Sequence, residues 1–545
     1  MIKKMFKRLL DEKYLPYLVA MILLIPSLVW IFLDNHVWPW DQAWYGEVSV
    51  TLYYNLTHSI SLWPQAMMSA FGIKAPAIAW FGQFFVPLSN LVGSVDRALL
   101  LYIVLFQFLS LIFIYKIILF LTNKNKNLAL LGMIITSSAP LFIGMGHQYF
   151  VESLQLFAVV FTIFIFINIG TWNKYNSIIA FIIALSYAML VKITSPLYIM
   201  PILALGFIYL IKNPQKESIK DYFKKRKNII LWILGILFSL AVISWYVINW
   251  NTIFQFMKLA SSGEAAELYG TKDSFYNKFN LWITFFKQSF FVPILAYVVC
   301  LAMGFFAIKH IARLKNINWK ENFTNMFSVS LITIVITLIF FSFQINEETR
   351  YLLPLISYVA IIICLMLNNE KAPIVFIFMG LFFCQYVFVN GVTLGLFEES
   401  QEINAWVTQM QPDKNNIKNV KYIVKKTCNR ESEYKINMVG VEFPWLNANS
   451  LEYYAMQSRL KTNILCYYTS LGYAENNAEN AWTRLETINP PFFIISNDKI
   501  SKNLEAFNGA SSQIVERIKN DPNFAQQSSS NSKNILIFKN ISKEK

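Results

Sequence analysis

Residues 14–33 of this 545-residue chain read YLPYLVAMILLIPSLVWIFL, an apolar run without a charged side chain. About 20 such residues cross a bilayer as a helix. A signal peptide has a shorter apolar core that is followed by small residues for cleavage. Here Trp30, Trp38 and Trp40 end or follow the run, which is typical of an interfacial aromatic belt. We therefore interpret residues 14–33 as an uncleaved first membrane span.

Similar runs recur along most of the chain, which is 56% hydrophobic and only 14% charged. Soluble domains carry about 25% charged residues. The pattern predicts a polytopic α-helical membrane protein with about eleven transmembrane helices. The expected spans are residues 14–33, 97–121, 127–146, 153–170, 177–191, 194–211, 229–249, 290–308, 324–343, 351–367 and 372–396.

The positive charge is concentrated in the apolar part. Residues 1–396 hold 29 Lys and Arg against 16 Asp and Glu, so that +13 of the net charge of +15 belongs to this part of the chain. Most of these cations fall in alternate loops, above all in residues 212–228, which places the N-terminus in the cytoplasm and the C-terminus outside. This distribution favours cytoplasmic retention of loops over nucleic-acid binding.

Two loops on the predicted outer side are long, residues 34–96 and 250–289. Within the first, residues 41–56 have apolar side chains at helical spacing and are expected to lie on the membrane surface. Residues 77–88 are apolar but too short to span comfortably, which favours a re-entrant or interfacial helix.

Residues 397–545 are polar and predict a separate, extracytoplasmic, soluble α/β domain, so that residues 1–396 form the membrane domain. Short apolar runs predict strands at residues 436–441, 463–468, 492–495 and 535–538, with helices at 449–460 and 513–519 and a polar loop at 526–532. Cys428 and Cys466 fall in this domain, where a disulfide is allowed but is not settled by sequence. Cys300, Cys364 and Cys384 lie in apolar spans and suit packing.

Polar side chains gather at the outer ends of the predicted spans. The first loop carries Asp34, Asp41 and Glu47, then Lys74. Later elements are residues 146–152, with His147 and Glu152, residues 192–196, which begin with Lys192, and residues 347–354, with Arg350 and Tyr351. Such a set could bind a phosphate through Lys and Arg and activate a hydroxyl with a carboxylate.

The order of these elements resembles bacterial membrane glycosyltransferases of the GT-C fold, especially the protein mannosyltransferase-like and aminoarabinose-transferase-like enzymes. Asp41, Tyr45 and Glu47 match an acid-Tyr-acid pattern in the first outer loop. Residues 74–76 match Lys-Pro-Pro with Ala in the second place, and residues 350–354 match Arg-Tyr-Leu-Leu-Pro without change.

Two further elements depart from the family pattern. Glu152 stands where Asp is more usual, and His147 lies near a position where Arg is common. Residues 192–196 match a Lys-Gly-Pro-like turn with two residues inserted. The resemblance covers residues 14–396 and leaves the C-terminal part without an assigned motif.

The resemblance implies inverting transfer of a hexosyl or pentosyl group from a polyprenyl-phosphate donor at the outer face of a bacterial inner membrane. The acceptor would be lipid A, another glycan or a protein. The implied catalytic residues are Asp41, Glu47 and Glu152. The implied substrate-binding residues are Tyr45, Lys74, His147, Lys192, Arg350 and Tyr351. No cofactor is expected, and nucleic acid is not a partner.

Alternatives stay open at this stage. If the acceptor is an ionised phosphate, Asp41 would orient it or bind a cation instead of taking a proton. His36 and His147 invite a divalent metal held together with Asp34, Asp41 and Glu152, although their spacing is not that of a zinc site. Structural interpretations are a helix cap for Asp41, interfacial anchoring for Lys74 and Lys192, and neutralisation of Arg350 by Glu347 and Glu348. The main rival function is that of a transporter or flippase. The second is that of a binding or scaffolding membrane protein.

Overall fold

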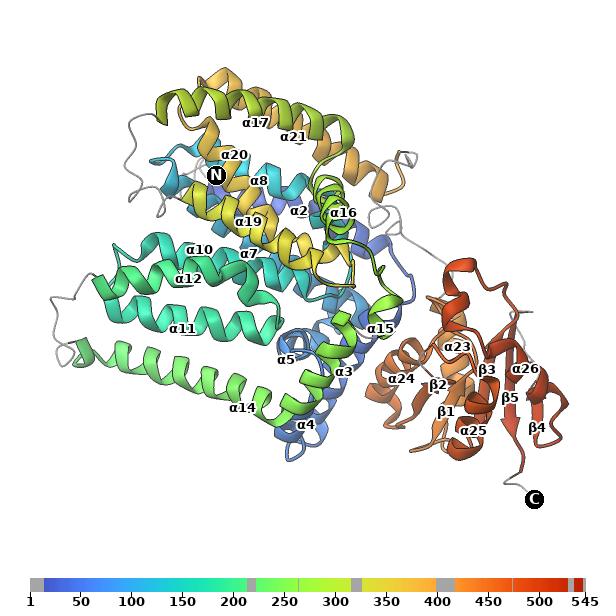
Figure 1. Ribbon diagram of the computed structural model, residues 1–545. Coiled ribbons are helices and arrows are strands. Elements are labelled where there is room, and N and C mark those ends of the chain that lie inside the picture. Colours follow the sequence, from blue (N-terminus) through green and yellow to red (C-terminus); the bar gives the residue numbers. More distant parts are fainter. Residues whose placement is uncertain are drawn as a thin grey trace, which may run out of the picture. The chain divides into compact units, whose positions relative to one another are not determined.

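The computed structural model describes residues 14–212, 222–262, 264–314, 326–397, 417–472, 474–527 and 534–542 (Figure 1). These residues form two compact units. The first takes its described residues from Met1–Phe32, Met68–Ile78 and Leu100–Gln411. The second takes them from Leu33–Met67, Ala79–Leu99 and Pro412–Lys545. Most of the long first loop is therefore grouped with the C-terminal part of the chain, which the sequence did not indicate.

The first unit is helical. Within it α11 packs on α10 and α14, α8 packs on α20 and α21, and α19 packs on α16 and α20. Its elements, the first part of α7 belonging to the second unit, are α2 (Leu15–Leu33), α7 (Val95–Leu121), α8 (Lys126–Ser138), α9 (Pro140–Gly146), α10 (Glu152–Asn168), α11 (Lys174–Val191), α12 (Ser195–Lys212), α14 (Arg226–Ser262), α15 (Glu264–Glu267), α16 (Phe275–Phe290), α17 (Pro293–Leu314), α19 (Met326–Ser342), η2 (Thr349–Leu352), α20 (Leu355–Leu367) and α21 (Ala372–Thr393).

Each of the eleven predicted spans overlaps a helix or a bent pair of helices, but not all are long enough to cross a bilayer alone. Among the described residues, six helices are long and apolar enough to cross a membrane, or up to eight if each bent pair is one span. The bent pairs are Lys126–Ser138 with Pro140–Gly146, and Phe275–Phe290 with Pro293–Ala302. Three other predicted spans fall on shorter apolar helices, α10, α19 and α20. The count of eleven is therefore not confirmed.

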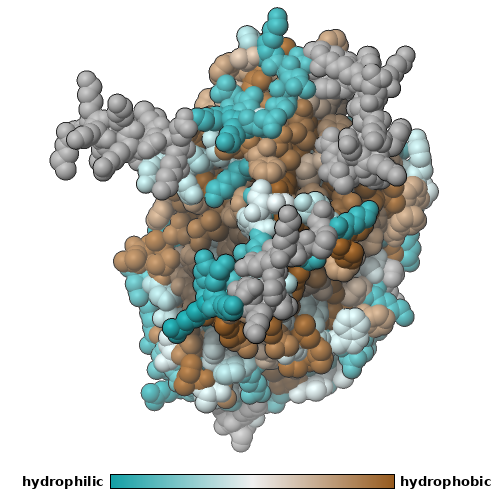
Figure 2. Space-filling model, turned by 90° about the vertical axis from the view of Figure 1, so that its left-hand side faces the viewer, coloured by the Kyte–Doolittle hydropathy of each residue, from teal (hydrophilic) through white to brown (hydrophobic). Residues whose placement is uncertain are grey.

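The apolar surface of the first unit suits a lipid environment. Helix α14 has exposed large hydrophobic side chains along its length, among them Ile230, Leu234, Leu237 and Ile248. Figure 2 shows one face of the molecule, on which hydrophobic side chains are widespread between patches of hydrophilic ones. Since water disfavours so much exposed apolar surface, the pattern indicates contact with lipid. Helix α14 also extends into the predicted loop 250–289, most of whose described residues are helical.

The second unit contains a five-stranded sheet of order β2-β1-β3-β5-β4. Strand β1 (Ile436–Val439) pairs in parallel with β2 (Tyr467–Ser470) and β3 (Phe492–Ser496). Strand β5 (Ile535–Asn540) pairs antiparallel with β3 and with β4 (Phe524–Gln527). The helices of this part are α23 (Ile417–Thr427), α24 (Ala448–Thr462), α25 (Ala478–Ile488), η3 (Lys502–Phe507) and α26 (Ser511–Asn520).

The small α/β fold predicted for the C-terminal part is confirmed, with differences in detail. Strand β2 begins four residues later than the predicted run 463–468, and helices α23 and α25 were not predicted. Strand β4 overlaps the predicted polar loop 526–532. Its residues Phe524-Ala-Gln-Gln lack an apolar run, and the pairing with β5 is what makes them a strand.

The first loop forms α3 (Trp40–His58), α4 (Trp63–Ser69), α5 (Ala77–Gly82), η1 (Gln83–Leu88) and α6 (Ser89–Val92). The helix predicted at 41–56 is present as α3, and it packs on α24. Ala43, Val50 and Leu52 of α3 are buried. The apolar side chains of this helix therefore have a protein partner within the second unit.

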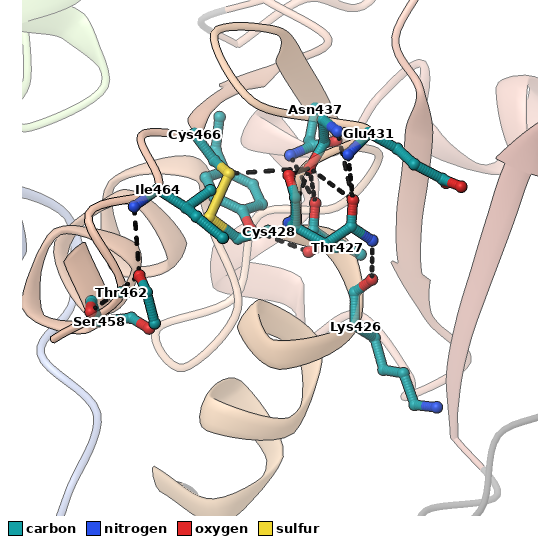
Figure 3. The surroundings of a disulfide bond; sticks show 12 residues. Lys426, Thr427, Cys428, Glu431, Asn437, Ser458, Thr462, Ile464 and Cys466 are labelled. Atoms are coloured by element: carbon teal, nitrogen blue, oxygen red, sulfur yellow. Dashed lines mark hydrogen bonds between the residues drawn. A yellow bond between two sulfur atoms is a disulfide. The ribbon is translucent and has the colours of Figure 1, made fainter.

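A disulfide joins Cys428, the residue after α23, to Cys466, the residue before β2 (Figure 3). Asn437 of β1 donates a hydrogen bond to the Thr427 carbonyl at 3.2 Å, and the Thr427 hydroxyl lies 2.8 Å from that of Tyr468. The disulfide thus lies where the end of α23 contacts the neighbouring strands β1 and β2.

Replacing both Cys428 and Cys466 with Ala is expected to lower the stability of the second unit by about 2–4 kcal/mol, because the cross-link restricts the unfolded chain. The measurement is the resistance of the C-terminal part of the full-length protein to protease across a temperature series. Cys384→Ala, at an exposed free cysteine, is the control. Equal resistance in the double variant and the wild type would show that the bond does not contribute.

Candidate functional site

An ion cluster in the first unit joins three segments that are distant in sequence. Glu152 is the first residue of α10, and its Oε1 lies 2.8 Å from Nζ of Lys192, the residue after α11. Arg350, in η2, places its Nε 3.7 Å from the same Oε1. The Glu152 side chain is only 1% exposed, whereas those of Lys192 and Arg350 are 18% and 12% exposed. The two cations are therefore the accessible side of the cluster.

Hydrogen bonds from neighbouring helices hold these segments together. The Tyr198 hydroxyl of α12 donates to the Tyr351 carbonyl at 2.6 Å, and the Tyr358 hydroxyl of α20 donates to the Tyr198 carbonyl at 2.6 Å. Gln155 of α10 donates to the hydroxyls of Thr194 and Ser195. The turn after α11 is thus tied to α10, which carries Glu152, and the 3-10 helix η2 is tied to α12.

Aromatic rings cover both cations. The Lys192 ammonium lies 4.0 Å from the centre of the Tyr351 ring, and the Arg350 guanidinium lies 4.5 Å from that of Phe150. Cations over aromatic faces gain up to about 2 kcal/mol when they are desolvated. Each ring also shields part of its cation from water, which strengthens the charge interactions of that cation.

The charges within the cluster are balanced. Glu348 Oε2 lies 3.3 Å from Arg350 Nε, so that two carboxylates face two cations. Burial lowers the pKa of Lys192, and the Glu152 carboxylate opposes that shift. An anionic ligand must therefore compete with a carboxylate, and Glu348, at 18% exposed, is better placed to move than Glu152. An ammonium has three donors, and Lys192 uses one on Glu152.

Sequence reasoning missed Lys278, a buried lysine of α16. Its Nζ lies 3.4 Å from Glu347 Oε1 and donates to the carbonyls of Gln344 and Ile345. Glu347 also accepts from the backbone and hydroxyl of Thr271. Of the two acids expected beside Arg350, Glu348 is there and Glu347 pairs with Lys278 instead. The only sequence feature that pointed to Lys278 was its place on an amphipathic helix, and that place does not reveal its partner Glu347.

The remaining predicted residues of the first unit are His147 and Lys74. The His147 ring is buried and stacks on Trp30, with ring centres 4.3 Å apart and planes 5° from parallel. Lys74 is half-buried in the segment between α4 and α5. Their predicted roles in substrate binding stay predictions.

Asp41, Tyr45 and Glu47 lie on α3 in the second unit. Asp41 is half-buried in the first turn of the helix. Tyr45 is buried at 5% exposed. Thr51 donates to Glu47 at 2.6 Å, and burial raises the pKa of Glu47 against the opposing charge of Arg459. These surroundings give Glu47 partners within its own unit.

The alternative metal site has no support in the part of the chain that the structure describes, where no group of three or more His, Cys, Asp and Glu side chains is placed to hold an ion. His36 pairs with Asp34 in the second unit. His147 and Glu152, which the same hypothesis invoked, belong to the first.

Glu452 of α24 predicts a pH dependence of stability in the second unit. Burial, with the nearby charge of Glu47, raises the pKa of Glu452 from 4.5 to about 8. The folded state therefore binds a proton that the unfolded state releases between these values, so the stabilisation is complete below about pH 4.5 and is lost as the pH rises to about 8. Glu452→Gln should flatten this decline and raise the unfolding temperature at pH 8 by about 2–4 °C.

The measurement is the unfolding midpoint from pH 5 to 8 for wild type, Glu452→Gln and the exposed control Glu505→Gln. A Glu452→Gln profile identical to that of the control would refute the explanation.

Comparisons with known proteins agree with this fold. Residues 73–248 match the model of the family described as dolichyl-phosphate-mannose-protein mannosyltransferase. ArnT from Cupriavidus metallidurans, solved bound to undecaprenyl phosphate, is 11% identical with a TM-score of 0.55, over 96% of this chain and 98% of that one. The archaeal oligosaccharyltransferase AglB from Archaeoglobus fulgidus, in complex with an inhibitory peptide and a dolichol-phosphate, is 10% identical with a TM-score of 0.53, over 98% and 75%. No curated protein matches the chain in sequence.

Residues 73–248 thus resemble that mannosyltransferase family, and the fold of the chain resembles those of ArnT and AglB. Both findings confirm the resemblance predicted from the sequence. The chain is an integral membrane protein with apolar helices and a small C-terminal sheet. Residues 73–248, which match the mannosyltransferase model, include two of the four members of the ion cluster, Glu152 and Lys192.

Proposed function

We propose that this protein is a glycosyltransferase that moves a sugar from a polyprenyl-phosphate carrier to an acceptor at the outer face of the membrane. The observation that carries the proposal is the cluster of Glu152, Lys192 and Arg350 in a unit of GT-C fold. Two proteins of that fold were solved with a polyprenyl phosphate or a dolichol-phosphate bound. A lipid phosphate also suits such a cluster, because its lipid chain can lie along the apolar helices while its phosphate contacts the cations.

Lys192 and Arg350 would bind the phosphate of the donor. In the transfer, the bond between the sugar C1 and the phosphate oxygen breaks, and negative charge grows on that oxygen. Cations held in a dry site stabilise such charge because they do not need to reorganise. Glu152 orients Lys192, Tyr351 supports its ammonium, and Glu348 gives way to the phosphate.

Asp41 is the proposed base, on the strength of the sequence resemblance. The acceptor oxygen attacks C1 from the face opposite to the phosphate, its proton passes to Asp41, and the polyprenyl phosphate leaves. This single displacement inverts the configuration at C1. An ionised phosphate as acceptor would leave Asp41 the task of orienting it. Tyr45, Lys74 and His147 are kept as proposed substrate-binding residues, and the contacts of Glu47 favour support of α3 over direct catalysis.

We place residues 397–545 outside the cytoplasm and the N-terminus inside, in the inner membrane of a bacterium. The disulfide between Cys428 and Cys466 supports this orientation, since such bonds persist in oxidising compartments. The sugar is a hexose or a pentose, and the acceptor is lipid A, another glycan or a protein.

The product of the reaction gives the test in cells. Envelope lipids, glycans and proteins of the source organism are compared by mass spectrometry with and without the gene. We expect one class of molecule to lose a single sugar residue when the gene is absent and to regain it with the wild-type gene. Identical envelopes would contradict the proposal, and an intracellular accumulation of an untransported substrate would favour the transporter.

A further inference from the structure

The C-terminal part of the second unit contacts the first loop on both sides of Asp41. Before Asp41, the Trp38 carbonyl accepts a hydrogen bond from the Ser450 hydroxyl at 2.7 Å, and the Trp38 ring stacks on Tyr453 with centres 5.0 Å apart. After it, Gly46 lies against the same Tyr453 so closely that an added Cβ would come within 2.7 Å of the ring. Any larger residue at Gly46 would force the Tyr453 ring or α3 itself to shift.

Further contacts join α24 to the end of α3 and to the end of the loop. At the end of α3, the Arg459 guanidinium lies 3.8 Å from the centre of the Tyr54 ring. Near the start of α7, Asp96 accepts from the Tyr453 hydroxyl at 2.6 Å and from Gln457 at 2.9 Å. One helix of the C-terminal part therefore contacts the beginning, the middle and the end of the loop.

Trp40, the residue directly before Asp41, has a strained backbone. Its φ is 27°, in the left-handed region that side chains other than Gly rarely adopt. Such conformations persist only where the surroundings enforce them, and they often occur at functional sites. Here the Trp40 indole donates a hydrogen bond to Glu442 Oε2 at 3.0 Å.

The backbone of Glu442 is held by the Asn508 side chain. Its backbone N–H donates to the Asn508 side chain at 2.8 Å, and Asn508 donates back to the Glu442 carbonyl at 3.1 Å. Glu442 follows β1, so that the acceptor for Trp40 is attached to the sheet and to the segment after η3. The indole is thus bonded to a residue that has hydrogen-bond partners of its own.

We infer that the C-terminal part of this chain holds the backbone before Asp41 in its strained conformation, with Glu442 as a positioning residue that acts through Trp40. The inference rests on the proposed function only for its effect on transfer. Its structural core concerns the conformation of residues 38–45 and holds for any activity of Asp41.

Hydrogen–deuterium exchange of the full-length protein tests this core without an activity assay. Glu442→Ala removes the acceptor, and we expect peptides covering residues 38–45 to exchange about five- to tenfold faster. Glu442→Gln keeps an oxygen acceptor and should exchange like the wild type. The exposed Glu505→Ala is the control, and Trp40→Phe removes the donor from the other side, so that it should reproduce Glu442→Ala even if that variant is poorly folded.

The transfer rate then separates positioning from mere stability. In an active preparation, Glu442→Ala and Trp40→Phe should each lower kcat about tenfold with little change in KM, and the double variant should lose no more than either. Unchanged exchange in residues 38–45 overturns the inference whatever the activity. Faster exchange with an unchanged kcat overturns the positioning role. If the wild type transfers no sugar, the proposed function fails, and the exchange result still decides the conformational claim.

Discussion

Replacing Lys192 with Met is expected to lower the rate of sugar transfer by about 10²–10³-fold, the usual cost of losing one preorganised donor to a developing negative charge. The ammonium lies 2.8 Å from Glu152 and 4.0 Å from the Tyr351 ring centre, in a cluster where no other lysine among the described residues forms an ion pair with Glu152. Binding of undecaprenyl phosphate, measured by native mass spectrometry, should weaken by at least about tenfold.

Loss of Lys192 also leaves the buried Glu152 without its nearest cation, which is costly for folding. The double variant Glu152→Gln with Lys192→Met removes both charges and should recover stability without recovering transfer. Lys192→Arg retains a cation and should keep part of the activity. Lys272→Met, at an exposed lysine of the same unit, is the matched control. A Lys192→Met protein that is folded and transfers at the wild-type rate would remove this cluster from the mechanism.

Asp41→Asn is expected to lower transfer by about 10²–10⁴-fold, the range in which a positioned general base acts. The change keeps the size of the side chain and its ability to accept a hydrogen bond in the first turn of α3, so folding should survive. Undecaprenyl phosphate should bind as in the wild type, because the phosphate is assigned to Lys192 and Arg350. The measurement is the rate of transfer and the binding of undecaprenyl phosphate in the same preparation.

Asp273→Asn, at an exposed acid outside both groups of predicted residues, is the control for the loss of one negative charge. Full activity of Asp41→Asn with a hydroxyl acceptor would show that Asp41 is not the base. Full activity with a phosphate acceptor only would instead identify an acceptor that arrives already ionised.

The parts of the site that could be predicted from the sequence are those whose signals are local. Glu152, Lys192 and Arg350 each stand at the end of an apolar run, and the side of the membrane assigned by charge counting brings such ends together. Their ordered motifs supplied the resemblance to a known class. The helices of the first unit followed from the same apolar runs, although α10, α19 and α20 are shorter than the runs suggested.

The parts that could not be predicted depend on contacts between distant segments. Nothing in the sequence indicated that α3 packs on α24 of the C-terminal part. The pairing of Glu347 with Lys278 joins helix α16 to the segment before η2, and strand β4 exists through its bonds to β5. The disulfide could only be left open, because it depends on the folding that brings the end of α23 beside the start of β2.

The C-terminal part gains a role from these contacts. In the sequence it was a separate domain without a motif, whereas in the structure it forms one unit with most of the first loop. The bond from Trp40 to Glu442 connects its sheet to the residue before Asp41. The effect of this part on transfer would then be exerted through the conformation of α3.

The most direct test of the central claim uses purified wild-type protein with a panel of undecaprenyl-phosphate-linked hexoses and pentoses and an extract of envelope acceptors. The quantity measured is the release of free undecaprenyl phosphate together with the appearance of the sugar on an acceptor. The account predicts that one donor is consumed with equal yields of both products. It also predicts that Lys192→Met and Asp41→Asn each slow the reaction by about 10²-fold or more, while Lys272→Met does not. A wild-type protein that binds undecaprenyl phosphate yet consumes none of these donors, or equal activity in all four proteins, would contradict it.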